Sequence, residues 1–210
     1  MTVTGTATGG TVSPRQRIMR AASSLFYSRG INSTSISDVA DRASVSKRTL
    51  YQLFLSKDVL VAAYLETGVG YLEPGNNEGR LNDPSLSPRE QLLALFDRPP
   101  EDPHFRGCPY HNAAVELSDR DHPGLPLVIE HKRQFLQQVV DAARRAGARE
   151  PDRLGRQLAV LFEGAMALTA SLDDSEAFEF ARTAAEDILR HGLPRDHPGQ
   201  APPVHQSPEQ

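Results

Sequence analysis

A cluster of polar and basic side chains follows Ser46, in a segment whose apolar residues have helical spacing. Arg48 can pair bidentately with a guanine, and Thr49 can contact a thymine methyl group or a phosphate. Such side chains on the first turns of a helix suit the base edges and phosphates of a DNA major groove. The alternative is an ordinary solvated helix, but the apolar pattern and the basic start of the segment favour DNA contact. The predicted surface comprises Ser46, Lys47, Arg48, Thr49, Tyr51 and Gln52.

Two short amphipathic helices, separated by a break too short to be a linker, are predicted to position this surface. Ser35 is a suitable N-cap for the first helix, and Asp38 completes a capping box. Ser46 can cap the second helix after the turn Ala43-Ser44-Val45. Helical spacing places on the inner faces Ile36, Val39, Ala40 and Ala43, followed by Leu50, Leu53 and Phe54. The pattern therefore predicts a helix-turn-helix whose second helix enters the major groove.

The run from Ile18 to Leu65 resembles the DNA-binding domain of TetR-family transcriptional regulators. The matching positions are the run Phe26 to Gly30, the run Ser35 to Ala40, and Val45, Ser46, Leu50, Tyr51, Phe54 and Lys57. Two residues depart from the family's pattern. Ser44 stands where a glycine often occurs, so a left-handed backbone there would cost about 1 kcal/mol or more. Arg48 replaces a residue that is usually small, so the base preference should be individual to this protein.

The resemblance implies an all-α fold of about nine helices. An N-terminal three-helix helix-turn-helix DNA-binding domain would precede a C-terminal helical bundle for ligand binding and dimerisation. In the family, the fourth helix points its N-terminus at a phosphate, which places Lys57 there, and the last two helices pair with their copies. The predicted divisions are a disordered tail at 1–12, the DNA-binding domain at 13–56, the ligand-binding and dimerisation domain at 57–191, and a disordered tail at 192–210.

The remaining helices follow from capping signals and apolar spacing. Ser-Pro pairs at Ser13 and Ser87 are each predicted to open a helix. Arg15 and Arg17, at the start of the first helix, either reach phosphates or are simply exposed. Other helices are predicted from Lys57 towards Tyr71, and at Cys108–Leu117, Leu127–Ala146, Asp152–Leu172 and Ser175–His191. The last two are rich in small and apolar residues, and the first of them carries more apolar surface than one side can use, which favours a homodimer over burial within the monomer.

Composition and charge narrow the class of protein. The 210 residues are 39% hydrophobic and 24% charged, which is typical of a globular protein. Residues 1–66 hold eight Lys/Arg and four Asp/Glu, whereas the rest hold fifteen and twenty-three, so a basic end precedes an acidic one. This asymmetry orients the molecule on DNA. With no membrane-spanning run, no signal peptide and a single cysteine, the chain is expected to be cytoplasmic and not to associate with a membrane.

Polar residues of the middle helices are candidates for an effector cavity. The residues predicted to bind a small molecule are Cys108, His111, Asn112, Glu116, His131, Phe135, Phe162, Glu163 and Met166. Two other readings remain: a divalent metal held by three of them (His111, Glu116, His131), or solvated and satisfied polar groups. No HExxH or CxxC spacing supports a metal, so none is predicted. Cys108 is either a redox sensor or, as most single cysteines are, a small buried hydrophobe.

These patterns favour a transcriptional repressor over an enzyme. No nucleophile, phosphate-binding or dinucleotide motif is present, and no cofactor is predicted. The expected protein is a homodimer that binds a palindromic double-stranded operator and is released by a small-molecule effector. Alternatives are an effector-independent, nucleoid-type DNA-binding protein, and a small-molecule-binding or catalytic bundle with a vestigial N-terminal domain. The predicted DNA contacts are Ser35, Ser37, Ser46, Lys47, Arg48, Thr49, Tyr51 and Lys57.

Overall fold

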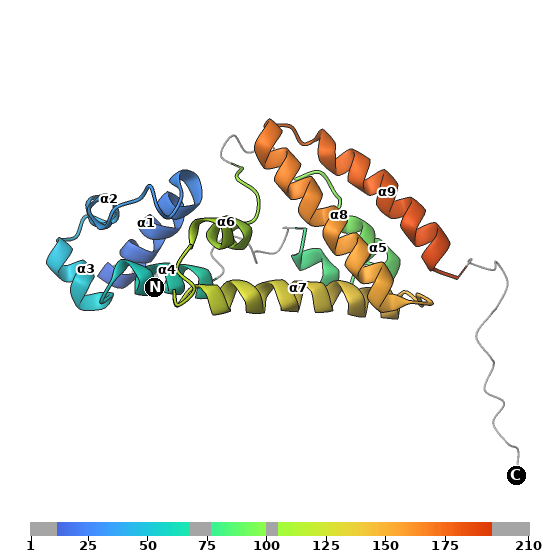
Figure 1. Ribbon diagram of the computed structural model, residues 1–210, viewed down its shortest axis with the longest axis horizontal. Helices are drawn as coiled ribbons and strands as arrows, with labels where there is room; N and C mark the ends of the chain where they lie inside the picture. Colours follow the sequence, from blue (N-terminus) through green and yellow to red (C-terminus); the bar gives the residue numbers. More distant parts are fainter. Residues whose placement is uncertain (1–11, 68–76, 100–104, 195–210) are drawn as a thin grey trace, which may run out of the picture.

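The computed structural model describes residues 12–67, 77–99 and 105–194, which contain nine α-helices, one short 3-10 helix and no strand. The predicted all-α fold is confirmed. Figure 1 shows a small group of helices at one end, a longer bundle at the other, and α6 between them. The predicted disordered tails fall almost wholly outside the described residues. Within these ranges, no helix is both long enough and apolar enough to cross a membrane.

Four helices form the first group: α1 (Pro14–Arg29), α2 (Ile36–Arg42), α3 (Lys47–Leu53) and α4 (Lys57–Glu66). Serine side chains cap all four, and those of α1 and α2 are full capping boxes. The helices enclose a shared apolar core whose largest fully buried side chains are Ile18, Leu50, Phe54 and Leu60. The helix that was predicted to run towards Tyr71 ends at Glu66 with Thr67 as its C-cap, and residues 68–76 lie outside the described ranges.

One prediction of a buried residue in the second helix of the helix-turn-helix is wrong. Leu53 was expected beside Leu50 and Phe54, but it is 39% exposed, whereas the other two are buried. The reason is that α3 ends at Leu53, and Phe54 has an extended backbone (φ −137°, ψ 110°). Helical spacing therefore stops applying at this point, and Phe54 reaches the core from outside the helix.

The turn between α2 and α3 confirms the predicted strain at Ser44. Ser44 has φ +53°, in the left-handed region that favours glycine. Its N–H donates to the carbonyl of Asp41 at 3.1 Å, and the N–H of Val45 donates to that of Ala40 at 3.0 Å. This pair of bonds is a Schellman motif, which satisfies the last carbonyls of α2 and turns the chain into α3.

Replacing Ser44 by glycine is expected to raise the free energy of unfolding by about 0.5–1 kcal/mol. Relief of the left-handed backbone gains about 1–2 kcal/mol, and the added freedom of the unfolded chain offsets part of it. Thermal unfolding measures the change, and Ser44→Ala is the control because it retains the Cβ and its strain. Equal stabilities of the glycine and alanine variants would contradict this explanation.

The second group contains a 3-10 turn and five helices. These are η1 (Gly79–Asn82), α5 (Pro88–Ala94), α6 (Pro109–Glu116), α7 (Leu125–Arg145), α8 (Pro151–Leu172) and α9 (Glu176–Gly192). The predicted bounds agree to within two residues for α6 to α9. Helix α8 packs between α7 and α9. The centre of the bundle is aromatic: the ring of Phe162 lies 5.4 Å from that of Phe135, 6.3 Å from Phe96 and 6.2 Å from Phe178.

Candidate nucleic-acid interface and ligand cavity

The exposed surface of α3 carries the polar side chains that its sequence predicted. Lys47, Arg48 and Tyr51 are exposed. Ser46 caps the helix by accepting a hydrogen bond from the N–H of Thr49 at 3.0 Å, and the two hydroxyl oxygens lie 2.8 Å apart. Ser46 therefore fixes both the start of α3 and the side chain of Thr49. Because the backbone of this first turn is held by its cap, the exposed donors are presented in a defined direction.

The predicted backbone contacts lie at the starts of α2 and α4. Asp38 Oδ2 accepts from the N–H of Ser35 at 2.8 Å and from its hydroxyl at 2.5 Å. These bonds, the side-chain one first, lower the pKa of the Asp38 carboxyl. Ser37 lies in the first turn of α2 and is half-buried, and Lys57 opens α4 directly after its cap Ser56. Ser35 therefore caps the start of α2, although it lies exposed at the surface.

The sequence did not predict the place of Arg15. Its guanidinium lies over the ring of Phe54, 4.6 Å from the centroid, which is a cation–π contact. The contact joins the start of α1 to the end of α3. No spacing in the sequence indicates it, because the two residues are thirty-nine positions apart and meet only through the tertiary fold.

A cavity of about 140 Å³ lies between the start of α6 and the second half of α8. Five of the nine residues predicted to bind a small molecule line it: Cys108, His111, Asn112, Glu163 and Met166. The other four lie elsewhere. Phe135 and Phe162 are buried in the aromatic centre, His131 stacks on Tyr110, and Glu116 faces the first group of helices. This cavity is called the α6–α8 cavity below.

Lys132, for which the sequence predicted no role, joins two residues of this cavity. Its Nζ donates to Glu163 Oε1 at 2.5 Å and lies 3.3 Å from Cys108 Sγ. Burial raises the pKa of the Cys108 thiol, and the nearby ammonium only partly opposes this, so the thiol form is favoured. A signal was available, because Lys132 falls on the same helical stripe as the buried Val128, Phe135 and Val139.

His131 and Tyr110 form a stacked pair deep in the second group. Their ring centroids are 3.6 Å apart, and the Tyr110 hydroxyl donates to the carbonyl of Leu65 at 2.9 Å. Burial, followed by the charge of Lys132, lowers the pKa of His131 to about 4. Glu78, itself buried, lies 3.6 Å from His131 Nε2 and acts in the opposite direction, towards the imidazolium. Burial has the larger effect on this pKa, so the imidazole is neutral at neutral pH.

Lowering the pH from 6.5 to 4 is expected to destabilise the protein by about 1–3 kcal/mol through His131 alone. The unfolded chain binds a proton on this residue near pH 6.5, whereas the folded chain binds it only near pH 4. Stability is therefore lost as the pH falls through this window. Urea unfolding across the window measures the loss, and His131→Phe, which keeps a ring on Tyr110, should show a smaller loss. Parallel pH profiles for the two proteins would contradict the assignment.

Both ends of α6 are hydrogen-bonded to the first group of helices. At its C-terminal end, Glu116 Oε2 accepts from the N–H of Asn32 at 2.7 Å, and the carbonyl of Glu116 accepts from Asn32 Nδ2 at 2.9 Å. Gly30 lies against the same carboxylate. It has φ +98°, a backbone conformation that favours glycine, and a Cβ there would lie in tight contact with both carboxylate oxygens, 3.1 Å away.

Just before α6, the chain contacts the end of α1. The Tyr27 hydroxyl donates to the carbonyl of Gly107 at 3.1 Å and lies 3.0 Å from the N–H of Arg106. The Arg106 side chain also donates to the carbonyl of Ser28 at 3.0 Å. Arg106 and Gly107 line the α6–α8 cavity as well. The cavity wall and the contact with α1 therefore share the same residues.

Both α8 and α9 expose large apolar side chains. Val160 is 74% exposed and Leu168 is 53% exposed on α8, and Phe180 is 69% exposed on α9. Gly164 lies between these two residues of α8, and a Cβ added to it would have no described atom within 4 Å. A surface of this kind, with apolar side chains around a small residue, permits another helix to approach closely. We call it the α8–α9 face.

Comparisons with known proteins agree with this geometry. Residues 18–64 match the family model of bacterial regulatory proteins of the tetR family. Over 110 residues the chain is 30% identical to the HTH-type transcriptional repressor KstR2 of Mycolicibacterium smegmatis, a match that covers 51% of this chain and 53% of the relative. It is 43% identical to the HTH-type transcriptional activator FasR of the same species over 85 residues, 40% of this chain and 39% of that protein. The matches thus span about half the length of these curated relatives, or less.

Solved structures match over most of the chain. A tetr-transcriptional regulator from Streptomyces avermitilis is 32% identical, with a TM-score of 0.73, and the match covers 86% of this chain and 98% of that one. A TetR-family transcriptional regulator from Streptomyces coelicolor is 29% identical, with a TM-score of 0.69, and the match covers 85% and 95%. The likeness includes the helical bundle as well as the helix-turn-helix.

Proposed function

The chain belongs to the TetR family of bacterial regulatory proteins, and we propose that it is a sequence-specific DNA-binding repressor released from its operator by a small molecule. The observation that carries the DNA-binding part is the exposed, capped first turn of α3, with Lys47 and Arg48 next to the fixed hydroxyl of Thr49. Arginine and lysine at this position suit guanine edges and phosphates. Residues 13–56 would form the DNA-binding domain and residues 57–191 the ligand-binding and dimerisation domain.

A homodimer is the form proposed to bind DNA. The α8–α9 face exposes apolar side chains that a second copy of the chain would cover, and the pairing of the last two helices with their copies in the family supports this. A two-fold dimer presents two copies of α3 to successive major grooves, so the operator should be roughly palindromic. Ser35, Ser37 and Lys57 would contact its phosphates, while Arg48 would read a base.

The proposed effector site is the α6–α8 cavity. Its lining offers a thiol, an imidazole, an amide and a carboxylate beside the apolar Met166, which suits a small polar compound. Occupation would act through α6, because Arg106 and Gly107 line the cavity and are also hydrogen-bonded to Tyr27 of α1. A compound that displaces this segment changes the orientation of the DNA-binding domain. It releases DNA only if it binds the displaced state more tightly.

Alanine substitutions are expected to separate base reading from phosphate contact. Arg48→Ala should cost about 1–3 kcal/mol on the best sequence and relax the preference at one operator position, because a bidentate base contact is lost. Lys57→Ala should weaken all sequences alike and reduce the slope of log affinity against log salt by about 1. Anisotropy on an operator obtained by random-sequence selection, and on its point variants, measures both. The same loss on every sequence for both variants would contradict this division.

The effector site has its own test. A library of small polar compounds would be screened for release of the protein from the selected operator, with the wild-type chain and with Met166→Trp. The larger ring is expected to fill much of the α6–α8 cavity, so a compound that acts there should release the wild-type protein but not the variant. A compound that releases both equally would place the effector elsewhere.

The second candidate is an effector-independent, nucleoid-type DNA-binding protein. It is favoured by the small volume of the α6–α8 cavity, about 140 Å³, which is below the usual range for ligand pockets. Its signature is nearly equal affinity for all duplexes with a strong salt dependence. The anisotropy series on selected and varied sequences therefore distinguishes the two candidates directly.

A further inference from the structure

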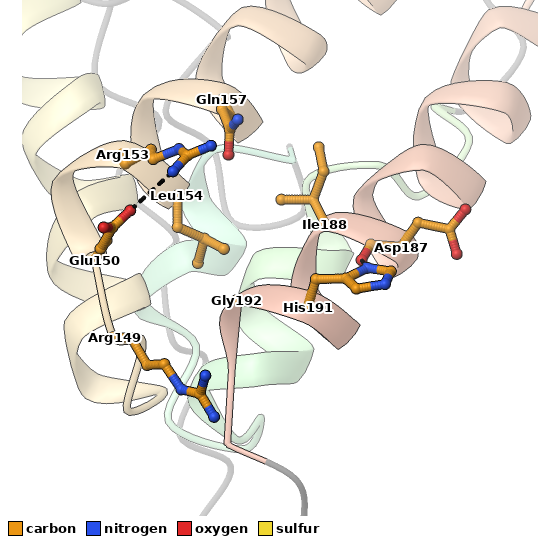
Figure 2. A pocket seen from close by; sticks show the side chains of 9 residues that line it. All are labelled: Arg149, Glu150, Arg153, Leu154, Gln157, Asp187, Ile188, His191 and Gly192. Carbon is orange, nitrogen blue, oxygen red and sulfur yellow. Dashed lines mark hydrogen bonds and ion pairs between the residues drawn. The ribbon is translucent and has the colours of Figure 1, made fainter.

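A larger pocket lies at the opposite end of the bundle from the DNA-binding domain. It has a volume of about 470 Å³ and lies between the start of α8 and the end of α9. Figure 2 shows side chains from both helices around it: Arg153, Leu154 and Gln157 from α8, and Asp187, Ile188 and His191 from α9. Its volume is within the range of small-molecule sites. We call it the distal pocket.

The floor of the distal pocket is apolar and its lower end is fixed. Leu154 and Ile188 project from the two helices into the space between them (Figure 2). At the lower end, a Cβ on Gly192 would lie 2.2 Å from Leu154 Cδ1, so glycine allows α9 to end against α8. The N–H of Arg149 donates to the carbonyl of Gly192 at 3.3 Å, which joins the two sides. The pocket is therefore held open above a closed end.

Within the part of the chain that the structure describes, the charges around the pocket leave one cation without a counter-ion. Glu150 is paired with Arg153 at 3.2 Å, and the Asp187 carboxylate is paired with Arg190 at 2.6 Å. In Figure 2 that carboxylate points away from the pocket. Among the described residues, the Arg149 side chain has no hydrogen bond or ion pair, and it is exposed at the edge of the pocket. Across the described ranges, the unpaired charge at the edge of the pocket is thus the Arg149 guanidinium.

We propose that the distal pocket binds an amphipathic monocarboxylate, with the carboxylate on Arg149 and the apolar body on Leu154 and Ile188. A guanidinium donates two parallel hydrogen bonds to a carboxylate, which a neutral head group cannot accept in the same way. The apolar body is removed from water against the two aliphatic side chains. This site is separate from the α6–α8 cavity, and the proposal does not depend on DNA binding.

Octanoate and 1-octanol are the probes that test the proposal, because they share a chain and differ in the head group. Titration calorimetry on the full chain should show octanoate binding more tightly than octanol. Arg149→Ala is expected to weaken octanoate about tenfold, equivalent to about 1.4 kcal/mol, and to leave octanol unchanged. Arg156→Ala is the matched control, because Arg156 is exposed on α8 and does not line the pocket, and it should change neither.

Reversing the charge at position 149 is a more stringent test than removing it. Arg149→Glu should bind octylammonium in preference to octanoate, the reverse of the wild-type order. Because Arg149 is exposed and its side chain has no partner among the described residues, the variant is expected to fold normally, which circular dichroism checks. Three results would each overturn the proposal: no octanoate binding by the wild-type chain, equal losses for Arg149→Ala and Arg156→Ala, or an unchanged order in Arg149→Glu. The first of these is also what a second copy covering the pocket would give.

Discussion

The double substitution Val160→Asp and Leu168→Asp is expected to produce a folded monomer that binds operator DNA about a hundredfold or more weakly than the wild-type chain. Both side chains lie on the α8–α9 face and are largely exposed, so aspartate there should cost the single chain little. In a dimer the same carboxylates would be buried without a partner. Loss of the second recognition helix removes the gain of binding two half-sites together, typically 10²–10⁴-fold.

Sedimentation velocity and anisotropy on the selected operator measure the two effects. Val115→Asp is the matched control, because Val115 is 73% exposed but lies on α6, away from the α8–α9 face. The control should stay dimeric and retain its affinity. A double variant that stays dimeric would place the interface elsewhere, and a monomer with unchanged affinity would show that DNA binding needs no dimer.

Gly155→Ala is expected to lower the free energy of unfolding by about 1–3 kcal/mol. A Cβ on Gly155 would lie 2.7 Å from the Cα of Val140 and 2.9 Å from its backbone nitrogen. These are atoms of the α7 backbone, so the clash is relieved only if α7 and α8 move apart. The gain in helix propensity from glycine to alanine, about 1 kcal/mol, is too small to cancel the loss of packing along the two longest helices.

The same substitution at Gly164 in the same helix is the control. A Cβ there meets no described atom, so Gly164→Ala should stabilise the single chain by up to about 1 kcal/mol. Both variants are best measured by urea unfolding in the Val160→Asp, Leu168→Asp background, where a partner subunit should not cover Gly164. If both glycine variants gave the same change in stability, the close approach of α7 and α8 would not be the cause.

The sequence predicted well those features of the fold that depend on residues close together in the chain. The serine caps of α1, α2, α3 and α5 depend on residues three positions apart, so a short window contains the whole interaction. The strain at Ser44 could be predicted because the turn is equally short. Leu53 was misplaced because helical spacing was extended past the last residue of α3 to Phe54, which has an extended backbone.

Contacts between elements that are far apart along the chain could not be predicted from the sequence. Glu116 shares a helical face with Asn112, so both were predicted to face one cavity. The structure directs the Glu116 carboxylate to Asn32, which is eighty-four residues away, and that contact depends on how α6 is placed against α1. Lys132 shows the opposite case: its position on an apolar stripe was visible in the sequence, but its partners on α6 and α8 were not.

The most direct test of sequence-specific DNA binding is fluorescence anisotropy with a duplex recovered by random-sequence selection and with a shuffled duplex of the same composition. Both titrations would be run across a salt series. The proposed function predicts two protomers on the selected duplex and an affinity at least about a thousandfold above that for the shuffled one at physiological salt. Equal, weak binding to both duplexes that disappears together as salt rises would contradict it, and would identify a non-specific DNA-binding protein instead.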